Sequence, residues 1–70
     1  MTKEELYTAV ELVNENIAND IRTAEETLSG DELTNKFNEI KFVTTEAELV
    51  GNDEAKENVI TLCDLIEQNG

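Results

Sequence analysis

Residues 2–29, TKEELYTAVELVNENIANDIRTAEETLS, decide the fold, because the stretch contains neither Gly nor Pro and repeats apolar residues at helical spacing. These apolar residues follow one another at intervals of three or four, and they are Leu6, Val10, Val13, Ile17, Ile21, Ala24 and Leu28. Thr2 followed by Glu5 fits an N-terminal capping box, and Gly30 fits a C-terminal stop. We therefore predict one straight helix over Thr2–Ser29, roughly 40 Å long at about 1.5 Å per residue.

The next segment supports two interpretations. Asp31 can cap a second, short helix with apolar positions at Leu33, Phe37 and Ile40, and we place its end near Ile40. The segment Ile40–Thr44 reads equally well as a short β-strand, because β-branched and aromatic residues dominate it. A lone strand would need a partner, so both interpretations stay open from the sequence.

The last part of the chain predicts a C-terminal helix. Thr45 followed by Glu48 fits another capping box, and Gly51 with Asn52 then breaks the chain. We predict the final helix from about residue 53 to residue 68, capped by Asn52 or Asp53. Its apolar face holds Ala55, Val59, Leu62, Cys63 and Ile66. The sequence thus predicts a mainly α fold, with residues 1–70 forming a single acidic helical domain.

The charge of the chain excludes several function classes. Seventeen Asp and Glu face five Lys and Arg, and the formal net charge is -12. Phosphates would repel such a surface, so we expect no direct binding to nucleic acid or to an anionic membrane. Regular spacing of the apolar residues, which make up 39% of the chain, distinguishes it from a disordered acidic tail. A core of this size rarely supplies more than about 3–5 kcal/mol, so dimerisation would be a natural remedy.

The residues for catalysis are missing. The chain has no His, one Ser at position 29 and one Cys at position 63, whereas nucleophilic catalysis normally needs an activated nucleophile beside a base. We therefore expect no enzyme, no metal and no cofactor, and we place Cys63 in the core. The Asp-Ser-Leu motif of acyl carrier proteins is absent around Ser29, and neither Asp31 nor Asp53 opens an EF-hand loop. Without a signal peptide or an apolar span, we expect a cytoplasmic protein.

The placement of the acids is the strongest functional signal. Two helical stripes are acidic, and they consist of Glu4, Glu11, Glu15 and Glu26 on the first helix and of Asp53, Glu57, Asp64 and Glu67 on the last. Either stripe alone is typical of a solvated face. Carboxylates one helical turn apart are separated by roughly 6 Å, which is comparable with the spacing of phosphates along one DNA strand. The two stripes together favour a surface that stands in for DNA, and we expect these eight residues to bind a partner.

With this length, charge and pair of stripes, the chain resembles small acidic DNA-mimic proteins, which phages often make. Among them it is most similar to host-takeover proteins that block a nucleoid-associated protein of the HU type. The resemblance implies a non-enzymatic inhibitor that occupies the basic DNA-binding surface of such a host protein. The leading alternative is a helical adaptor that binds a partner through apolar helix faces. A carrier protein modified at Ser29 is a third interpretation.

The segment Leu33–Thr45 differs from the rest of the chain. Its net charge is +1, from Lys36, Glu39 and Lys41, and it holds both phenylalanines, Phe37 and Phe42. These two rings either fill the monomer core or form the contact between two copies, and we expect a homodimer with this segment at the interface. Further candidates for partner contact are two single apolar residues outside the apolar faces of the first and last helices, Leu12 and Ile60.

Overall fold

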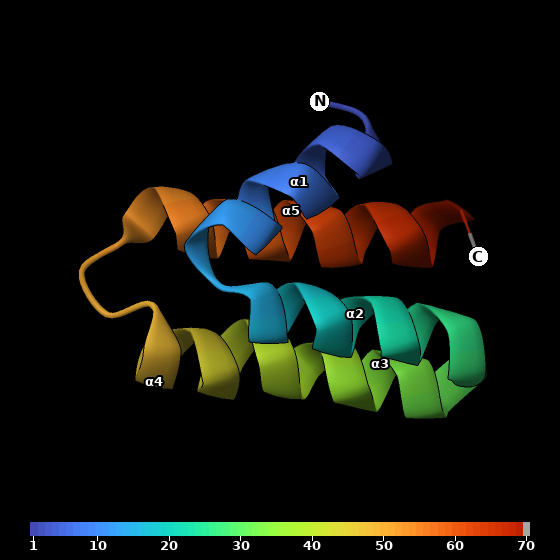
Figure 1. Cartoon of the computed structure of the whole chain (residues 1–70). Coiled ribbons are helices and arrows are strands. Elements are labelled where there is room, and N and C mark those ends of the chain that lie inside the picture. The colour runs from blue at the N-terminus through green and yellow to red at the C-terminus, as the bar shows by residue number, and fades with distance from the viewer. Residues whose placement is uncertain (70) are drawn as a thin grey trace.

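The computed structural model describes residues 1–69, and these residues form helices joined by short connections (Figure 1). In chain order they are α1 (Lys3–Val13), α2 (Glu15–Thr27), α3 (Gly30–Glu39), the π-helical turn η1 (Ile40–Thr44), α4 (Thr45–Glu48) and α5 (Asp53–Asn69). No strand occurs among these residues. The predicted fold class, a small mainly α domain with a long N-terminal helical stretch and a C-terminal helix, is confirmed.

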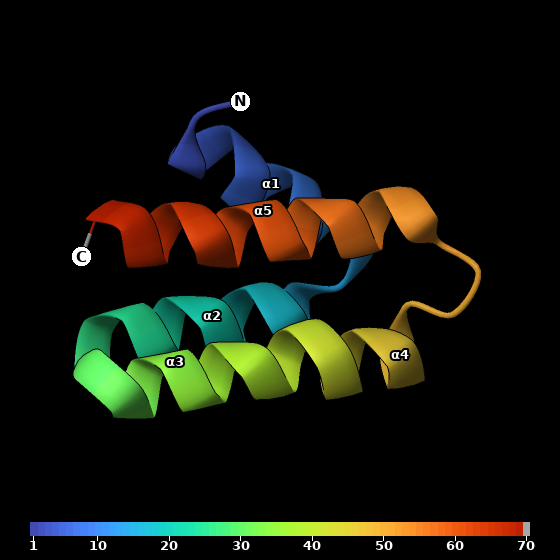
Figure 2. The same cartoon turned by 180° about the vertical axis from the view of Figure 1, so that it is seen from behind.

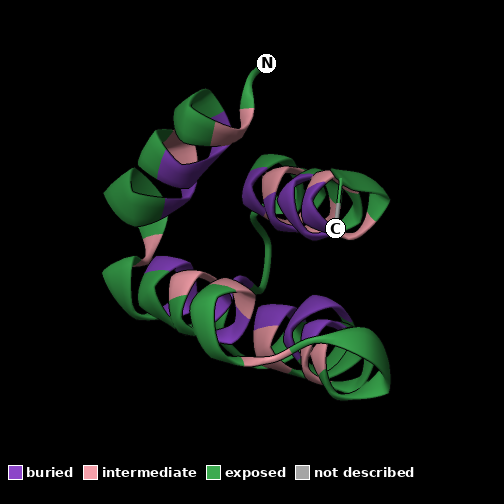
Figure 3. Ribbon diagram, turned by 90° about the vertical axis from the view of Figure 1, so that its right-hand side faces the viewer, coloured by how far each residue is buried: buried purple, intermediate pink, exposed green. Residues whose placement is uncertain are grey.

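The helices surround one apolar core. Helix α1 packs against α5 and α2, and α2 lies beside α3, as the front and back views show (Figures 1 and 2). Seen along the helices, the buried faces turn toward the centre and the exposed faces toward the outside (Figure 3). The end of α5 and the α2–α3 turn lie at one end of the molecule, and the α1–α2 junction and the loop before α5 lie at the other (Figure 1). None of the helices in the described part of the chain is both long and apolar enough to cross a membrane.

Asn14 divides the N-terminal stretch into two helices, so the prediction of one straight helix over Thr2–Ser29 is wrong. Its backbone is extended, with φ −154° and ψ 97°, and its side-chain oxygen accepts a hydrogen bond of 3.1 Å from the Ile17 amide, which caps α2. Because of this break, α1 can fold back beside α2 while both pack on the same core. The longest dimension of the molecule is 31 Å, shorter than the predicted rod.

The seven apolar residues at helical spacing between Leu6 and Leu28, which we call the apolar seam, stay on the core side across the break, except for the residue next to it. Five of its seven members are buried, Leu28 is half-buried, and Val13, next to the break, is 48% exposed. The core also takes Tyr7 and Ala18, which the seam did not include. The capping box of Thr2 with Glu5 is confirmed.

The predicted boundary between the first two helical segments is wrong in two details. Helix α2 already ends at Thr27, and Gly30, expected as its stop, is instead the first residue of α3, with a φ of +58° that favours glycine. The N-cap of α3 is Ser29 and not Asp31, and the Ser29 side chain makes no capping hydrogen bond.

The segment Ile40–Thr44 is helical, which corrects the alternative of a β-strand. The Thr45 amide donates to the carbonyl of Ile40, five residues earlier, and this bond defines the π-helical turn. The Thr45 hydroxyl donates to the carbonyl of Lys41. A helix pairs these backbone groups within the segment, whereas a lone strand would leave them without partners. Thr45 lies inside this continuous helical run, so the capping box with Glu48 is also wrong.

Helix α5 follows the prediction closely. Asn52 caps it by accepting a hydrogen bond of 3.2 Å from the Ala55 amide. All five residues of its predicted apolar face are buried. Gly51, in the break before it, has a φ of +79°. The start of α5 is therefore set by local turn and capping chemistry that the sequence makes visible.

Candidate interaction surface

The acidic side chains lie on the outside of the bundle. None of the seventeen is buried, and only Glu25 and Glu67 are half-buried. Each of the five basic side chains is within ion-pair distance of an acid of the same chain. The pairs are Lys3–Glu25 at 2.8 Å, Arg22–Glu11 at 2.8 Å, Lys36–Glu39 at 3.3 Å, Lys41–Asp64 at 3.0 Å and Lys56–Glu46 at 3.4 Å. Twelve acidic side chains therefore remain outside the ion pairs of residues 1–69.

The first predicted stripe is exposed but not straight. Glu4 and Glu11 lie on α1, Glu15 and Glu26 lie on α2, and the break at Asn14 separates the two pairs. Glu11 is neutralised by Arg22, which bridges α1 and α2. The stripe thus offers three carboxylates outside ion pairs, distributed over two helices.

The second predicted stripe is divided by its surroundings. Asp53 and Glu57 are exposed on α5, whereas Asp64 is paired with Lys41. Glu67 is half-buried, and its Oε1 is shielded from solvent without a hydrogen-bond partner among the described residues. Only the first two of these residues are both exposed and outside ion pairs.

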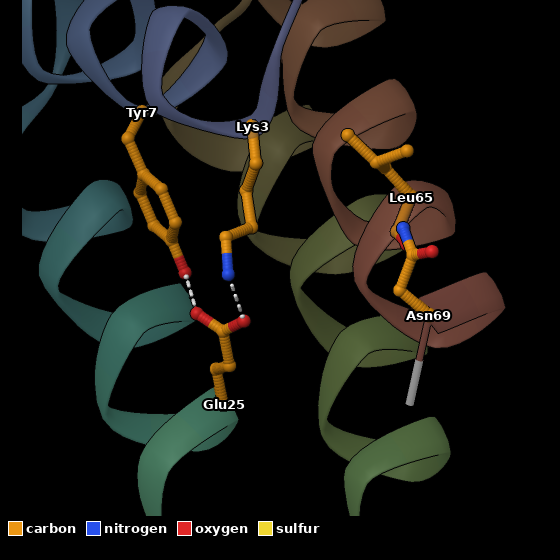
Figure 4. A network of polar contacts seen from close by, with 5 residues as sticks. All are labelled: Lys3, Tyr7, Glu25, Leu65 and Asn69. Carbon is orange, nitrogen blue, oxygen red and sulfur yellow. Dashed lines mark hydrogen bonds and ion pairs between the residues drawn. The ribbon is translucent and has the colours of Figure 1, made fainter.

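A polar network that the sequence analysis missed joins α1 to α2. The Tyr7 hydroxyl and the Lys3 ammonium both donate to the Glu25 carboxylate, each at 2.8 Å (Figure 4). Burial works against ionisation of Glu25, but these two hydrogen bonds outweigh it and hold the pKa of Glu25 below its ordinary value of 4.5. Burial and the bond to Glu25 raise the pKa of Tyr7. The Arg22 guanidinium lies 4.6 Å from the centre of the Tyr7 ring, so both basic residues of this region hold α1 against α2.

A pocket of about 660 Å³ opens beside this network, between the α2–α3 turn and the end of α5. Its apolar lining comes from Leu28, Leu33 and Ile66. Three acids also line it, namely Glu25, Asp31 and Glu67, together with Lys3, Ser29, Gly30, Thr34 and Asn69. An apolar floor with acids around it can receive a side chain that has an apolar stem and a cationic head.

The two side chains of nucleophilic type, Cys63 and Ser29, lie in different environments. Cys63 is fully buried, and burial raises the pKa of its thiol to about 12, so the thiol stays protonated and unreactive. Ser29 is exposed at the N-cap of α3. Within residues 1–69, no three His, Cys, Asp or Glu side chains are grouped so that they could hold a metal ion.

The two phenylalanines lie in opposite environments. Phe37 is 0% exposed and belongs to the monomer core, which is one of the two roles that the sequence left open for it. Phe42 is 62% exposed, as is its neighbour Val43. Leu12 is 83% exposed on α1, and Ile60 is half-buried on α5. Exposed apolar surface is therefore present at η1 and at the end of α1.

Comparison of this chain with known protein families, with curated proteins and with solved structures finds no match.

Proposed function

We propose that this protein is a non-enzymatic DNA mimic, which inhibits a basic DNA-binding protein by occupying its DNA-binding surface. The observation that carries the proposal is the pairing of all five basic side chains with acids of the same chain. Lys36 and Lys41, which interrupt the negative charge in the sequence, are neutralised by Glu39 and Asp64. A partner would meet a surface with twelve acidic side chains outside ion pairs and no unpaired basic side chain among the described residues.

The mechanism is electrostatic. Lysines and arginines that hold DNA phosphates would meet carboxylates instead, and the charge of -12 would steer the encounter over long range at low salt. A surface that copies only the charge of DNA cannot copy the edges of the bases. The favoured partner is therefore a protein that holds the backbone without reading sequence, such as a nucleoid protein of the HU type. A phage that takes over a bacterial host would gain from such an inhibitor.

The experiment is a displacement assay. Labelled duplex DNA is first bound to a purified HU-type protein. The 70-residue acidic protein is then added, at about 0.05 M and at about 0.3 M salt. We expect displacement at the lower salt, a steep loss at the higher salt, and no binding of this protein to the DNA itself. Failure to displace DNA at low salt from any basic host protein tested would contradict the proposal.

A matched pair of double variants separates the surface from net charge. Glu15→Lys with Glu26→Lys reverses two exposed acids outside ion pairs, and Glu39→Lys with Glu46→Lys reverses two acids already paired with lysines. Both variants change the net charge equally. We expect the first to raise the concentration needed for half-displacement about tenfold and the second less than about threefold, because lysines at the first two positions would repel the basic partner. Equal effects would mean that net charge alone acts.

The alternative function, a helical adaptor, is favoured by the exposed apolar side chains at η1 and at the end of α1. An adaptor that docks through apolar faces would hold its partner with little dependence on salt, whereas a charge mimic would release it. The salt series of the displacement assay therefore distinguishes the two.

A further inference from the structure

One stretch of the chain carries no acid outside an ion pair. Residues 33–47 contain two acids, Glu39 and Glu46, which pair with Lys36 and Lys56. This is the longest such stretch in the described chain, with fifteen residues, and the next longest, residues 6–14 and 58–66, have nine each. This stretch includes the whole of η1 (Figure 1). The surface over η1 is thus locally neutral on a molecule of charge -12.

The π-helical turn exposes apolar side chains at this neutral place. Ile40, Lys41 and Thr45 turn toward the core and are buried, whereas Phe42 and Val43 point outward. Two more exposed apolar residues follow at intervals of four and three, Ala47 on α4 and Val50 in the turn after it. We name Phe42, Val43, Ala47 and Val50 the neutral apolar face. Grouped exposed apolar residues of this kind mark interaction sites more often than scattered ones do.

The buried side chain of Lys41 lies next to this face. Its side chain is only 9% exposed, and its ammonium pairs with Asp64 at 3.0 Å. The same ammonium lies 5.7 Å from the centre of the Phe42 ring, which places a cation beside the ring. Burial works against the charged form of Lys41, but the bond to Asp64 outweighs it and raises the pKa of Lys41. The cation is therefore held within the monomer, beside the exposed ring.

From these contacts we infer that the neutral apolar face is the interface of a homodimer. Two copies that met through other parts of the surface would bring unpaired carboxylates together, and like charges at an interface cost free energy. At the neutral apolar face each copy presents apolar side chains beside internally neutralised pairs, so the second copy meets less uncompensated charge there than elsewhere on the surface. The acid outside an ion pair that lies nearest in sequence is Glu48, which accepts a hydrogen bond of 3.1 Å from the Asn14 side chain. A basic DNA-binding partner, in contrast, would gain nothing from a neutral surface. The inference does not depend on the proposed function.

The dimer should be weak and should respond to salt in a characteristic direction. A stable interface buries about 800 Å² on each partner, which would be nearly a fifth of the 4335 Å² surface of this small molecule. A face of four side chains is smaller, so we expect dissociation in the micromolar range. Salt screens the repulsion between two copies of charge -12, so dimerisation should tighten as salt rises. Charge-based binding to a basic partner would change in the opposite direction.

The test is sedimentation of the purified protein from about 5 µM to about 500 µM, at about 0.05 M and about 0.5 M salt. We expect a monomer–dimer equilibrium whose dissociation constant falls several-fold at the higher salt. Phe42→Ser combined with Val43→Ser should raise that constant at least about tenfold, in line with the loss of central apolar contacts. A monomer under every condition would overturn the inference.

A control variant keeps the test specific. Leu12→Ser removes an apolar residue that is 83% exposed on α1, leaves the net charge unchanged, and should leave the dimer intact. Circular dichroism should show that all variants melt like the parent, because the replaced side chains are exposed in the monomer. Equal loss of the dimer in Leu12→Ser, or a dimer that persists in the double variant, would overturn the placement. The sedimentation experiment contains only this protein. Its outcome therefore does not depend on whether the protein displaces DNA from a basic partner.

Discussion

Two places in the chain depart from the regular α-helix, and they do so in opposite ways. At Asn14 the backbone becomes extended, one helix ends and the next begins with its own cap. At Ile40–Thr44 the backbone stays helical, and one additional residue is accommodated within a wider turn. The first interruption changes the direction of the chain, and the second changes only which side chains face outward.

The consequences differ in kind. The break at Asn14 lets α1 return along α2, which brings Tyr7 and Lys3 to Glu25 across 18 and 22 residues of sequence. The π-helical turn also makes a long-range contact, between Lys41 and Asp64 across 23 residues, but it leaves Phe42 and Val43 exposed while Thr45 stays in the core. The capped break therefore serves contacts inside the monomer, whereas the π-helical turn combines such a contact with exposed apolar surface.

The largest effect is expected from the two phenylalanines that lie on either side of the start of η1. Phe37→Ala should cost about 3–5 kcal/mol of unfolding free energy through lost burial and a cavity, which is about all that a core of this size supplies. Phe42→Ala should cost less than about 0.5 kcal/mol, because its ring is exposed in the monomer. Urea unfolding below the dimer concentration range, followed by circular dichroism, measures both. Similar losses for the two variants would contradict the outward orientation of Phe42.

An intermediate effect is expected at the break. Asn14→Ala removes the cap of α2 and the 3.1 Å hydrogen bond to Glu48, and it should cost about 1 kcal/mol of unfolding free energy. The control is Asn16→Ala, an exposed position inside α2, which should be neutral or slightly stabilising because Ala favours the helix. Thermal melts of both variants give the comparison. If Asn14→Ala were as stable as the parent, the capped break would not be needed for the fold.

The smallest effect is expected for the network that the break brings together. Glu25→Gln should cost about 0.5 kcal/mol near neutral pH, in the range of partly exposed ion pairs. Because the pKa of Glu25 is lowered in the folded state, its contribution is fully present above its ordinary pKa of 4.5 and is lost as pH falls through the folded value. The melting temperatures of parent and variant should therefore differ at neutral pH and converge in acid.

The control for this pH series is Glu26→Gln. This neighbour is exposed and forms no ion pair in the described structure, so its replacement should relieve repulsion and slightly raise the melting temperature. A Glu25→Gln variant that behaved in the same way at neutral pH would show that the hydrogen bonds from Lys3 and Tyr7 contribute no net stability.

The sequence predicts those features that depend on neighbouring residues. The capping box of Thr2 with Glu5, the cap at Asn52 and the buried face of α5 all follow from residues within a turn or two of each other. The helix break at Asn14 was missed because the apolar spacing continues across it. The local sequence does not distinguish an Asn that caps a helix from an Asn within one. The π-helical turn was missed because one additional residue shifts the helical phase, which makes Ile40–Thr44 look like the alternation of a strand.

The candidate surface was predictable in composition and not in arrangement. The excess of acids is evident from counting, but the pairing of Lys41 with Asp64 joins residues 23 apart, and no local pattern encodes it. The same holds for Tyr7, whose position beside Leu6, outside the seam, gives no indication of its hydrogen bond to Glu25. Phe37 and Phe42 could not be distinguished because the sequence left Ile40–Thr44 open between helix and strand. In a continuous helix, at about 100° per residue, a separation of five residues places the two rings on different sides, as found.

The π-helical turn also has an evolutionary consequence. A π-turn within an α-helix is what a single inserted codon produces when the helix on both sides keeps its core contacts. Deleting Val43 should return the stretch to a regular α-helix, with Phe37 and Thr45 still in place. The outward face over η1 can therefore gain or lose an apolar residue by one in-frame codon, without compensating changes in the core. Selection on self-association could act at this position while selection on folding acts elsewhere.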